Sequence, residues 1–491
     1  MKYLIVLLLS MGSLPLLCIA QQKSPDKLDQ FLAIAEDLFR KAQLPGAGLS
    51  IVHQGEIIYT GGFGYANLDR QQPVSDTSLF VLASTTKAFT GLIAAKLVDQ
   101  GLLDWKTPII HYLPDFTLSE PYIAEHINLE DLFTHMSGLA QDDQLWLGQP
   151  ISREAVFQQT ATLPFTHSFR STWAYNNHAY VIIGKVLETV SGQSWETLLQ
   201  ELIFDPLGMN QSCAQHDHFL QNPNHVTGYF GDGKTIRPHN NSDNIAPAGG
   251  ISSTPKDMAK WLQFIAQKGN LNGTQQVSKE VFEYLTQPKG MSFTDTCSVQ
   301  YYSIGWGGLR TAGRRTLRHG GAIAGNSARV SVMPDDGFGI FVGTNQRSDF
   351  KDILTDYAEQ LFVHENFQRD TIRENVLINL NRFIQFQNTL LAEGIPAAKA
   401  YHERLLYTDF EADLIALGNA FLEAGYLEPA VFVFELNCQE RPTSIQALSQ
   451  YAKVLIQQGD LDKAKEQFEK ILEYSPNHPA AKEALKDLEN R

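Results

Sequence analysis

Cysteine is scarce in this chain, with four residues among 491. Cys18 lies in an apolar segment at the N-terminus, so three cysteines remain beyond it, Cys213, Cys297 and Cys438. Three thiols cannot build a disulfide scaffold or a four-cysteine zinc module. They allow one disulfide, for which Cys213 and Cys297 are the candidate pair. The alternative is three unpaired thiols that are mostly buried.

Positive charge is also in short supply. Lys and Arg number 39 against 54 Asp and Glu, which gives a net charge of −15. A chain this acidic is poorly suited to gripping a phosphate backbone, so we expect no nucleic-acid partner. Gly and Pro together stay near the ordinary background, which excludes collagen-like and low-complexity chains. The length predicts more than one folded domain, and the hydrophobic share of 43% is enough to build a sizeable core.

Long apolar runs are missing except at the N-terminus. Lys2 precedes an apolar stretch over 3–17, and Cys18-Ile19-Ala20 then has the form of a cleavage site. The stretch is too short and interrupted for a bilayer span, which needs about 20 residues. We therefore expect a signal peptide over 1–20 and a secreted protein, in the bacterial periplasm, with no transmembrane segment. Lipidation at Cys18 is the alternative.

The C-terminal part repeats with a period of 34 residues. Eight positions recur in register between two copies: Leu414, Leu417, Gly418, Phe421, Gly425, Ala430, Phe434 and Pro442, then Leu448, Tyr451, Ala452, Leu455, Gly459, Ala464, Phe468 and Pro476. Small residues recur where two helices approach closely, and large apolar residues recur where the pair buries its face. This pattern resembles tetratricopeptide repeats. We expect two repeats plus a capping helix over 411–491, after a helical connector over 366–410 that holds a degenerate half-repeat. The repeats either support the preceding domain or bind a protein partner.

Residues in the middle of the chain carry catalytic chemistry. Ser84 and Lys87 open a helix that is apolar on most sides and ends at Gly101. A spacing of three places both side chains on one face, so Lys87 can accept the Ser84 proton if burial lowers its pKa. The helix dipole also favours negative charge developing at Ser84. A Ser-x-x-Lys pair is weak evidence alone because it is common in helices.

Two later motifs strengthen that interpretation. Tyr175 and Asn177 form Tyr-x-Asn before an apolar helix, and His319 and Gly321 form His-x-Gly before a hairpin of strands 328–333 and 339–344. The order Ser-x-x-Lys, Tyr-x-Asn, His-x-Gly resembles the serine β-lactamase and penicillin-binding superfamily, of the class C and D,D-peptidase type. Segments 129–139 and 246–254 resemble it too.

The resemblance implies a fold and a set of roles. The fold is α/β: an antiparallel sheet flanked by helices, with a helical subdomain, over 21–365. Ser84 is then the nucleophile that forms an acyl-enzyme, Lys87 its base, and Tyr175 the proton donor to the leaving group if a neighbouring cation depresses its pKa. Asn177 holds the substrate amide and Lys87. The backbone N–H groups of Ser84 and Ala322 form the oxyanion hole.

Two details concern the third motif. Gly321 has no side chain to block a substrate lying along its strand. His319 stands where penicillin-recognising relatives usually carry a lysine, and an imidazole is largely uncharged above about pH 7. This favours an esterase or D-amino-acid peptidase with weak β-lactamase activity at most, acting on a small-molecule or peptide substrate.

Other interpretations of the sequence remain open. A non-catalytic protein could use the hydrolase fold and the repeats to hold peptide partners. His216-Asp217-His218 has the side chains for a metal site, but no third ligand is placed nearby in the sequence, so we expect a solvated loop. The motifs imply no metal and no organic cofactor.

Overall fold

The computed structural model describes residues 27–229, 236, 241–294, 298–311, 314–403, 411–423, 425–476 and 478–489. The signal peptide expected over 1–20, Cys18 and Cys297 lie outside these ranges. Among the described residues, no helix is both long and apolar enough to cross a membrane.

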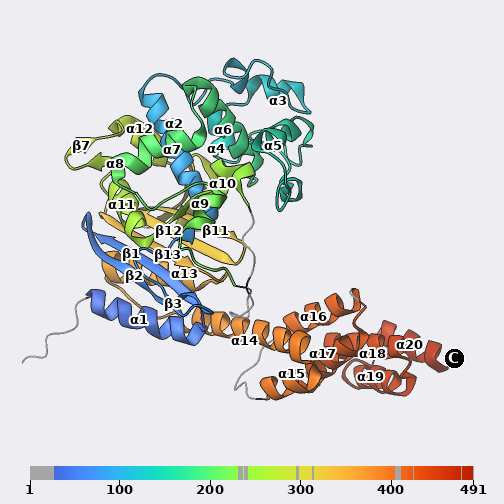
Figure 1. The fold of residues 1–491 in the computed structure, drawn as a ribbon. Helices are drawn as coiled ribbons and strands as arrows, with labels where there is room; N and C mark the ends of the chain where they lie inside the picture. Colours follow the sequence, from blue (N-terminus) through green and yellow to red (C-terminus); the bar gives the residue numbers. More distant parts are fainter. Residues whose placement is uncertain are drawn as a thin grey trace, which may run out of the picture.

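A nine-stranded sheet lies at the centre of the N-terminal domain, and each strand is antiparallel to its neighbours (Figure 1). The strand order is β3-β2-β1-β13-β12-β11-β10-β9-β8. The bounds are β1 Gly46–His53, β2 Glu56–Asn67, β3 Gln72–Pro73, β8 Gly290–Thr294, β9 Ser298–Tyr302, β10 Gly307–Thr311, β11 Arg314–Ile323, β12 Asn326–Met333 and β13 Phe338–Thr344. Leu49 of β1 pairs with Val342 of β13, so the first and last strands of the domain meet inside the sheet.

The two faces of the sheet belong to different cores. Ile340 and Val342 point into a core with α1 (Lys27–Ala42) and α13 (Phe350–Glu359), whereas Phe341 between them belongs to the core on the other face. This alternation is the two-residue period of a strand that is buried on both sides. It explains why β13 is buried along its whole length.

A helical subdomain covers the second face of the sheet (Figure 1). Its helices are α2 Thr86–Asp99, α3 Pro121–His126, α4 Leu129–Phe133, α5 Arg153–Gln159, α6 His178–Ser191, α7 Trp195–Leu199, α8 Asp205–Leu207, α9 His216–Gln221, α10 Ala246–Gly249, α11 Pro255–Ala266 and α12 Lys279–Thr286. Short strand pairs join β4 (Phe80–Val81) to β5 (Ser252–Ser253) and β6 (Asn270–Leu271) to β7 (Thr274–Gln275). Helix α2 runs through the middle of this core, and most of its residues are buried.

The C-terminal part consists of antiparallel helix pairs. The first pair is α16 (Glu411–Glu423) with α17 (Leu427–Glu440), the second is α18 (Ile445–Gln458) with α19 (Leu461–Tyr474), and α20 (Pro479–Glu489) follows. Gly418 lies against Phe434, and a Cβ on it would come within 2.5 Å of that ring. Gly425 and Gly459 adopt left-handed backbone angles at the turns, a conformation that favours glycine.

One long helix belongs to both parts of the molecule. Helix α14 (Thr371–Glu393) begins against the sheet domain, where its Leu377 joins the core of α1 and α13. Further along, Phe386 and Leu390 of the same helix join the core of the repeats, together with Ala398 of α15 (Ile395–His402). Figure 1 shows α14 running from beneath the sheet into the repeats.

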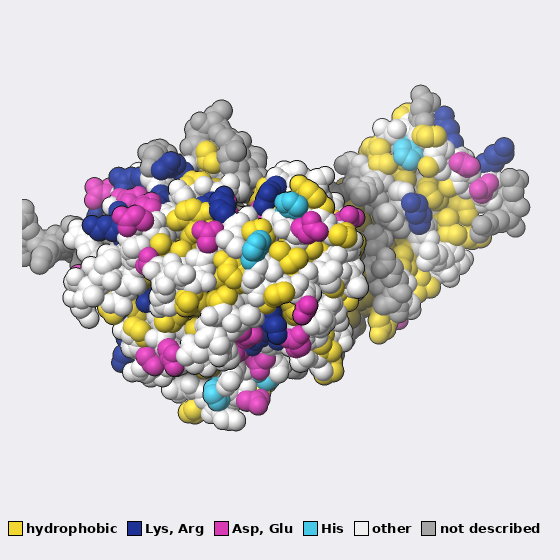
Figure 2. Space-filling model, turned by 90° about the horizontal axis from the view of Figure 1, so that it is seen from above, with side chains coloured by type: hydrophobic (Ala, Val, Ile, Leu, Met, Phe, Trp, Pro, Cys, Tyr) yellow, Lys and Arg dark blue, Asp and Glu magenta, His cyan; other side chains and the backbone are white. Residues whose placement is uncertain are grey.

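Acidic and basic side chains are intermingled on the face seen in Figure 2. Lys and Arg lie there among Asp, Glu and apolar groups, and they form no single basic surface on that face. This view therefore shows no large positive field of the kind that guides nucleic-acid binding.

Candidate active site

Ser84 lies in a strained turn at the start of the buried helix. The turn η1 (Ala83–Thr85) runs directly into α2. Ala83, just before the serine, has a φ of 48° and is buried. A non-glycine residue in this left-handed region costs about 1–3 kcal/mol, and such strain is concentrated at functional sites.

Lys87 is completely buried, and its Nζ has three oxygen neighbours. It lies 3.3 Å from Ser84 Oγ, 2.8 Å from Asn177 Oδ1 and 2.8 Å from the Ala248 carbonyl oxygen. Burial lowers the pKa of Lys87 to about 7, against a smaller opposing influence from Asp143. The amine is therefore neutral in a large fraction of molecules near neutral pH, as a base for Ser84 must be.

The segment around α10 fixes α2 in place. Thr90 donates to the Pro247 carbonyl at 2.7 Å, and Thr86 accepts from the Ile251 amide at 3.1 Å. With the Lys87 contact to Ala248, three polar side chains in the first turns of this helix are paired with segment 246–251. Segment 246–254 resembles a family segment in sequence, and these hydrogen bonds show that it holds the start of α2 in place.

Asn177 connects Lys87 to a carboxylate. Its Oδ1 accepts from Lys87, and its Nδ2 donates to Asp143 Oδ1 at 3.0 Å. The same oxygen of Asp143, in the turn η3 (Asp143–Leu145), accepts from Trp146 Nε1 at 2.9 Å. Asp143 thus lies one side chain away from the Lys87 amine, which explains why it acts on the Lys87 pKa.

Tyr175 lies beside Ser84 and Lys87 with a buried hydroxyl. Lys87 Nζ is 4.8 Å from the centre of the Tyr175 ring, and the hydroxyl has no partner at ordinary hydrogen-bond geometry. Burial raises the pKa of Tyr175, and the interaction with Ser84 lowers it by less. The depressed pKa that the sequence analysis required is therefore absent. Tyr175 is a protonated hydroxyl, which suits a proton donor and not a base.

His135 holds the Tyr175 loop. Its carbonyl accepts from the Ala174 amide at 2.9 Å, its Nδ1 accepts from the Asn176 amide at 3.1 Å, and its ring centre is 4.4 Å from that of Tyr175. Burial lowers the pKa of His135 well below its usual value, so the ring is neutral. Segment 129–139 therefore acts as a support for Tyr175.

Strand β11 passes directly beside the turn that carries Ser84. Strand β10 pairs with β11 only as far as Arg318, so the edge from His319 onward is left to the turn η1. A Cβ on Gly321 would come within 2.2 Å of the Leu82 carbonyl oxygen and 2.8 Å of the Ser84 amide nitrogen. Glycine at 321 therefore lets β11 approach the turn that carries Ser84. The next residue, Ala322, is exposed near the Ser84 amide.

Ser84 and Ala322 line one pocket of about 480 Å³, here called the Ser84 pocket. Its lining also includes Asp143, Tyr175, Asn177 and Arg347. Arg347 is exposed and, among the described residues, has no ion-pair partner. Arg347 therefore supplies the positive charge in the lining of the Ser84 pocket.

His319 faces a neighbouring pocket, of about 310 Å³, that shares Tyr175 with the Ser84 pocket. Its Nε2 is 2.7 Å from the Tyr302 hydroxyl and its Nδ1 is 2.7 Å from the Gly320 carbonyl oxygen. The pair of contacts assigns the proton to Nδ1, with Nε2 accepting from Tyr302. Burial, with Lys87 nearby, lowers the pKa of His319 to about 3. His319 is thus a neutral side chain held by its neighbours, and it lines the pocket next to the Ser84 pocket.

The other candidates lie apart from this site. His216, Asp217 and His218 begin α9, and no cluster of metal-ligating side chains occurs in the described part of the chain. Cys213 has a free thiol whose pKa burial raises to about 11. Its suggested partner Cys297 lies outside the described residues.

Comparison with protein families identifies the family of the N-terminal domain. The Beta-lactamase family model matches residues 27–364, which include the Ser-x-x-Lys, Tyr-x-Asn and His-x-Gly motifs. The chain belongs to the beta-lactamase family. A Tetratricopeptide repeat model matches residues 415–488. Both resemblances predicted from the sequence are confirmed.

Relatives of this beta-lactamase-family chain are distant. Unguisins hydrolase ungD of Aspergillus violaceofuscus is 26% identical over 335 residues, covering 62% of this chain and 58% of its own length. Protein flp of Staphylococcus aureus is 23% identical over 358 residues, covering 70% and 68%. The chain thus spans less than two thirds of the length of the Aspergillus hydrolase. A solved octameric penicillin-binding protein homologue from Pyrococcus abyssi has the same fold, with a TM-score of 0.60, 23% identity and coverage of 74% and 81%.

Sequence reasoning missed two residues of this site. Asp143 carries no motif and lies 34 positions before Asn177, so only the fold brings them together. Tyr302 also lacks a local signal, although its hydroxyl determines the tautomer of His319.

Proposed function

We propose that this protein is a serine hydrolase that cleaves an ester or amide through an acyl-enzyme on Ser84. The observation that carries the proposal is the position of Lys87, whose buried amine lies 3.3 Å from Ser84 Oγ with a pKa lowered to about 7. Family membership and a relative named as a hydrolase support it.

The reaction follows from the positions of the side chains. Neutral Lys87 takes the Ser84 proton while Oγ forms a bond to the substrate carbonyl carbon, whose electron pair moves onto oxygen. The amides of Ser84 and Ala322 bind that oxyanion. Tyr175 gives its proton to the leaving group as the carbon–leaving-group bond breaks, and the Lys87 ammonium restores it. Water then attacks the carbonyl carbon of the acyl-enzyme while neutral Lys87 takes its proton, and the Lys87 ammonium returns that proton to Ser84 Oγ as the bond between Oγ and the acyl group breaks.

The substrate is a small molecule or peptide with an ester or amide bond. Because His319 is neutral, it supplies no ionic partner for a substrate carboxylate. Arg347, at the pocket lining, is the group that meets such a charge. A panel of a short-chain ester, a D-amino-acid peptide and a penicillin separates the three substrate classes.

The test of the chemistry is covalent labelling. Intact-mass analysis after a fluorophosphonate probe should show one adduct on the wild-type protein and none on Ser84→Ala. Ser171→Ala, an exposed serine outside the site, is the matched control and should label normally. Equal labelling of Ser84→Ala and wild type would remove Ser84 as the nucleophile and favour a non-catalytic binding role.

Two further proposals rest on sequence pattern. We propose export of the protein with removal of residues 1–20, which N-terminal sequencing of the protein from its source would test. We also propose that the repeats bind a protein partner, because their family model matches 415–488 and such repeats expose helix surfaces.

A further inference from the structure

A second cavity, of about 760 Å³, lies in the helical subdomain on the other side of a wall of the Ser84 pocket. We call it the Arg153 pocket. It is bounded by segment 148–152, α5, α6, Glu196 of α7 and Asn241, Asp243 and Asn244. The two pockets share a wall, because Trp146, Leu147 and Ile245 line the Ser84 pocket while their neighbours Gly148 and Asn244 line the Arg153 pocket.

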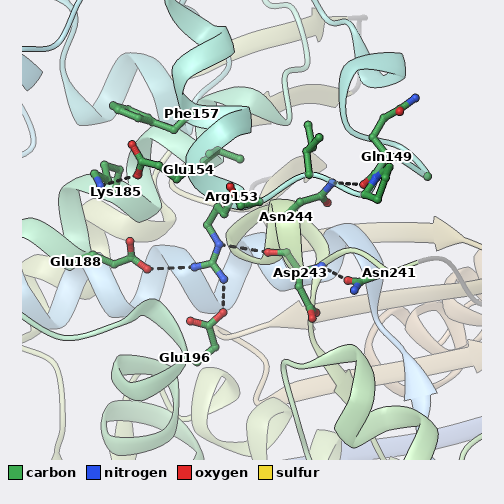
Figure 3. Close-up of a pocket in the computed structure, with 15 residues that line it drawn as sticks. Gln149, Arg153, Glu154, Phe157, Lys185, Glu188, Glu196, Asn241, Asp243 and Asn244 are labelled. Atoms are coloured by element: carbon green, nitrogen blue, oxygen red, sulfur yellow. Dashed lines mark hydrogen bonds and ion pairs between the residues drawn. The ribbon is translucent and has the colours of Figure 1, made fainter.

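Carboxyl groups outnumber cations in this lining. It contains Glu154, Glu188, Glu196 and Asp243 against Arg153 and Lys185. Figure 3 shows Arg153 in the middle of the pocket, with Glu188 and Glu196 on one side and Asp243 on the other.

Both cations already have partners. Arg153 donates to Glu188 at 3.1 Å, to Glu196, and to the Asp243 backbone carbonyl at 3.3 Å. Lys185 lies 2.7 Å from Glu154. The positive charges of the lining are therefore satisfied from within the protein, and a negative excess remains.

Asp243 is the carboxylate of this lining without a close ion pair, and the charges of Arg153 and His216 act on it only from a longer distance. Its Oδ1 accepts from the His216 amide at 3.0 Å, and no lysine or arginine of the described chain forms an ion pair with its carboxyl group. A partly buried carboxylate without a cation is unfavourable, and a cation that arrives beside it gains a charge-assisted hydrogen bond.

Asn244 gives an independent sign of an incomplete site. It is 6% exposed, and its Nδ2 donates to the Trp146 carbonyl at 2.9 Å. Its Oδ1 is buried without a hydrogen-bond donor. An unmatched acceptor in the lining invites an N–H donor from a ligand. Ile151, Phe157 and Val181 supply apolar surface in the same lining.

From these groups we propose that the Arg153 pocket binds an organic cation, an amine or guanidinium on a short apolar chain. The Asp243 carboxylate forms an ion pair with the charged group of the ligand, and Asn244 Oδ1 accepts a hydrogen bond from one of its N–H groups. The apolar side chains of the lining cover the rest of the ligand. Because the two pockets share a wall, a ligand bound in the Arg153 pocket then changes the surroundings of the Lys87 amine.

A continuous series of hydrogen bonds supports the transmission. Asn244 bonds the Trp146 carbonyl at 2.9 Å, Trp146 Nε1 bonds Asp143 at 2.9 Å, Asn177 bonds Asp143 at 3.0 Å, and Lys87 bonds Asn177 at 2.8 Å. A ligand that displaces Asn244 therefore moves the group that acts on the Lys87 pKa. This second statement rests on the proposed hydrolase function, whereas the binding statement does not.

Calorimetry on the full chain carrying Ser84→Ala tests binding without catalysis. The probes are butylguanidine and its neutral analogue butylurea. We expect butylguanidine to bind about tenfold or more tightly than butylurea, since a charge-assisted bond is worth that factor. Asp243→Asn, which keeps the acceptor for His216, should remove the preference. Asp217→Asn, an exposed neighbour outside the lining, should keep it. Equal binding of the two probes, or full binding to Asp243→Asn, would overturn the site.

Kinetics test the transmission separately. Butylguanidine should change kcat/KM for a neutral ester in the wild type. In Trp146→Phe, which lacks the bond to Asp143, the probe should still bind by calorimetry while its effect on kcat/KM disappears. Binding with no effect on wild-type turnover would overturn the transmission. A wild-type protein with no ester, peptide or penicillin turnover would count against the hydrolase proposal and leave the calorimetric result standing.

Discussion

Lys87 and Asn177 are joined by a hydrogen bond of 2.8 Å between Nζ and Oδ1. The bond orients the amine toward Ser84 and also links it to Asp143, because the Asn177 amide donates to that carboxylate. The base of the site is consequently adjusted by two opposing influences, burial that lowers its pKa and a carboxylate that raises it.

The first prediction concerns pH. Because neutral Lys87 is the base and its pKa is about 7, the acylation rate should rise with pH up to about 7 and then level off. Asp143→Asn removes the charge that raises this pKa, so the rising limb should move to lower pH. Stopped-flow measurement of the acylation rate between pH 5 and 9, on the wild type and on Asp143→Asn, tests both expectations. Asp142→Asn is the control, and a limb that stays in place in Asp143→Asn would contradict the role of Asp143.

The second prediction concerns Tyr175. Replacing it with phenylalanine removes the proton donor to the leaving group, so acylation should fall by about 10²–10⁴. Lys87→Ala should cause a similar fall. Circular dichroism should be unchanged in both, and Tyr122→Phe, whose side chain is exposed, should be fully active. Near-normal turnover in Tyr175→Phe would remove that hydroxyl from the mechanism.

A third prediction compares two adjacent glycines. Gly321→Ala should abolish acylation or stability, because its Cβ would lie 2.2 Å from the Leu82 carbonyl oxygen in the nucleophile turn. Gly320→Ala should be tolerated, because its Cβ would lie 3.5 Å from the nearest atom, on Arg329. Thermal denaturation together with fluorophosphonate labelling distinguishes the two. Similar behaviour of both variants would mean that β11 does not support the turn as described.

The fourth prediction concerns substrate charge. Arg347→Gln should lower kcat/KM for a penicillin by about 3–10-fold and leave a neutral ester nearly unchanged, because an exposed charge contact contributes little more. The wild type should prefer the ester, since His319 is neutral, and His319→Lys should shift the ratio toward the penicillin. The ratio of the two kcat/KM values at pH 7.5 is the measurement. Penicillin turnover equal to that of the ester in the wild type would favour a β-lactamase.

The fifth prediction concerns the repeats. A fragment over 411–491 lacks Phe386 and Leu390, which complete its core, so it should melt well below a fragment over 366–491. In the longer fragment Phe386→Ala should cost about 3–5 kcal/mol, as a buried phenylalanine does. Arg373→Ala, at the start of the same helix, is the control. Equal melting temperatures of the two fragments would show that α14 does not stabilise the repeats.

The sequence predicted what local spacing determines. The fold class is confirmed because the Ser-x-x-Lys, Tyr-x-Asn and His-x-Gly motifs resemble a known family, and the repeats are confirmed because their 34-residue period is visible along the chain. The three-residue spacing of Ser84 and Lys87 also predicts their proximity. The environment of a side chain depends on distant segments, so the neutral His319 and the raised pKa of Tyr175 could not be derived. The contact of Gly321 with the turn around Ser84 could not be derived for the same reason, because that turn lies more than 200 positions earlier.

Because α14 contributes to both cores, the connection between the catalytic domain and the repeats is a packed helix and not a flexible linker. A flexible linker would let a bound partner explore a wide volume and reach the catalytic pocket only at random. A helix packed at both ends instead sets one distance and one direction. A partner held by the repeats is therefore presented to the enzyme from a constant position, and its local concentration at the pocket depends on geometry rather than on chain length.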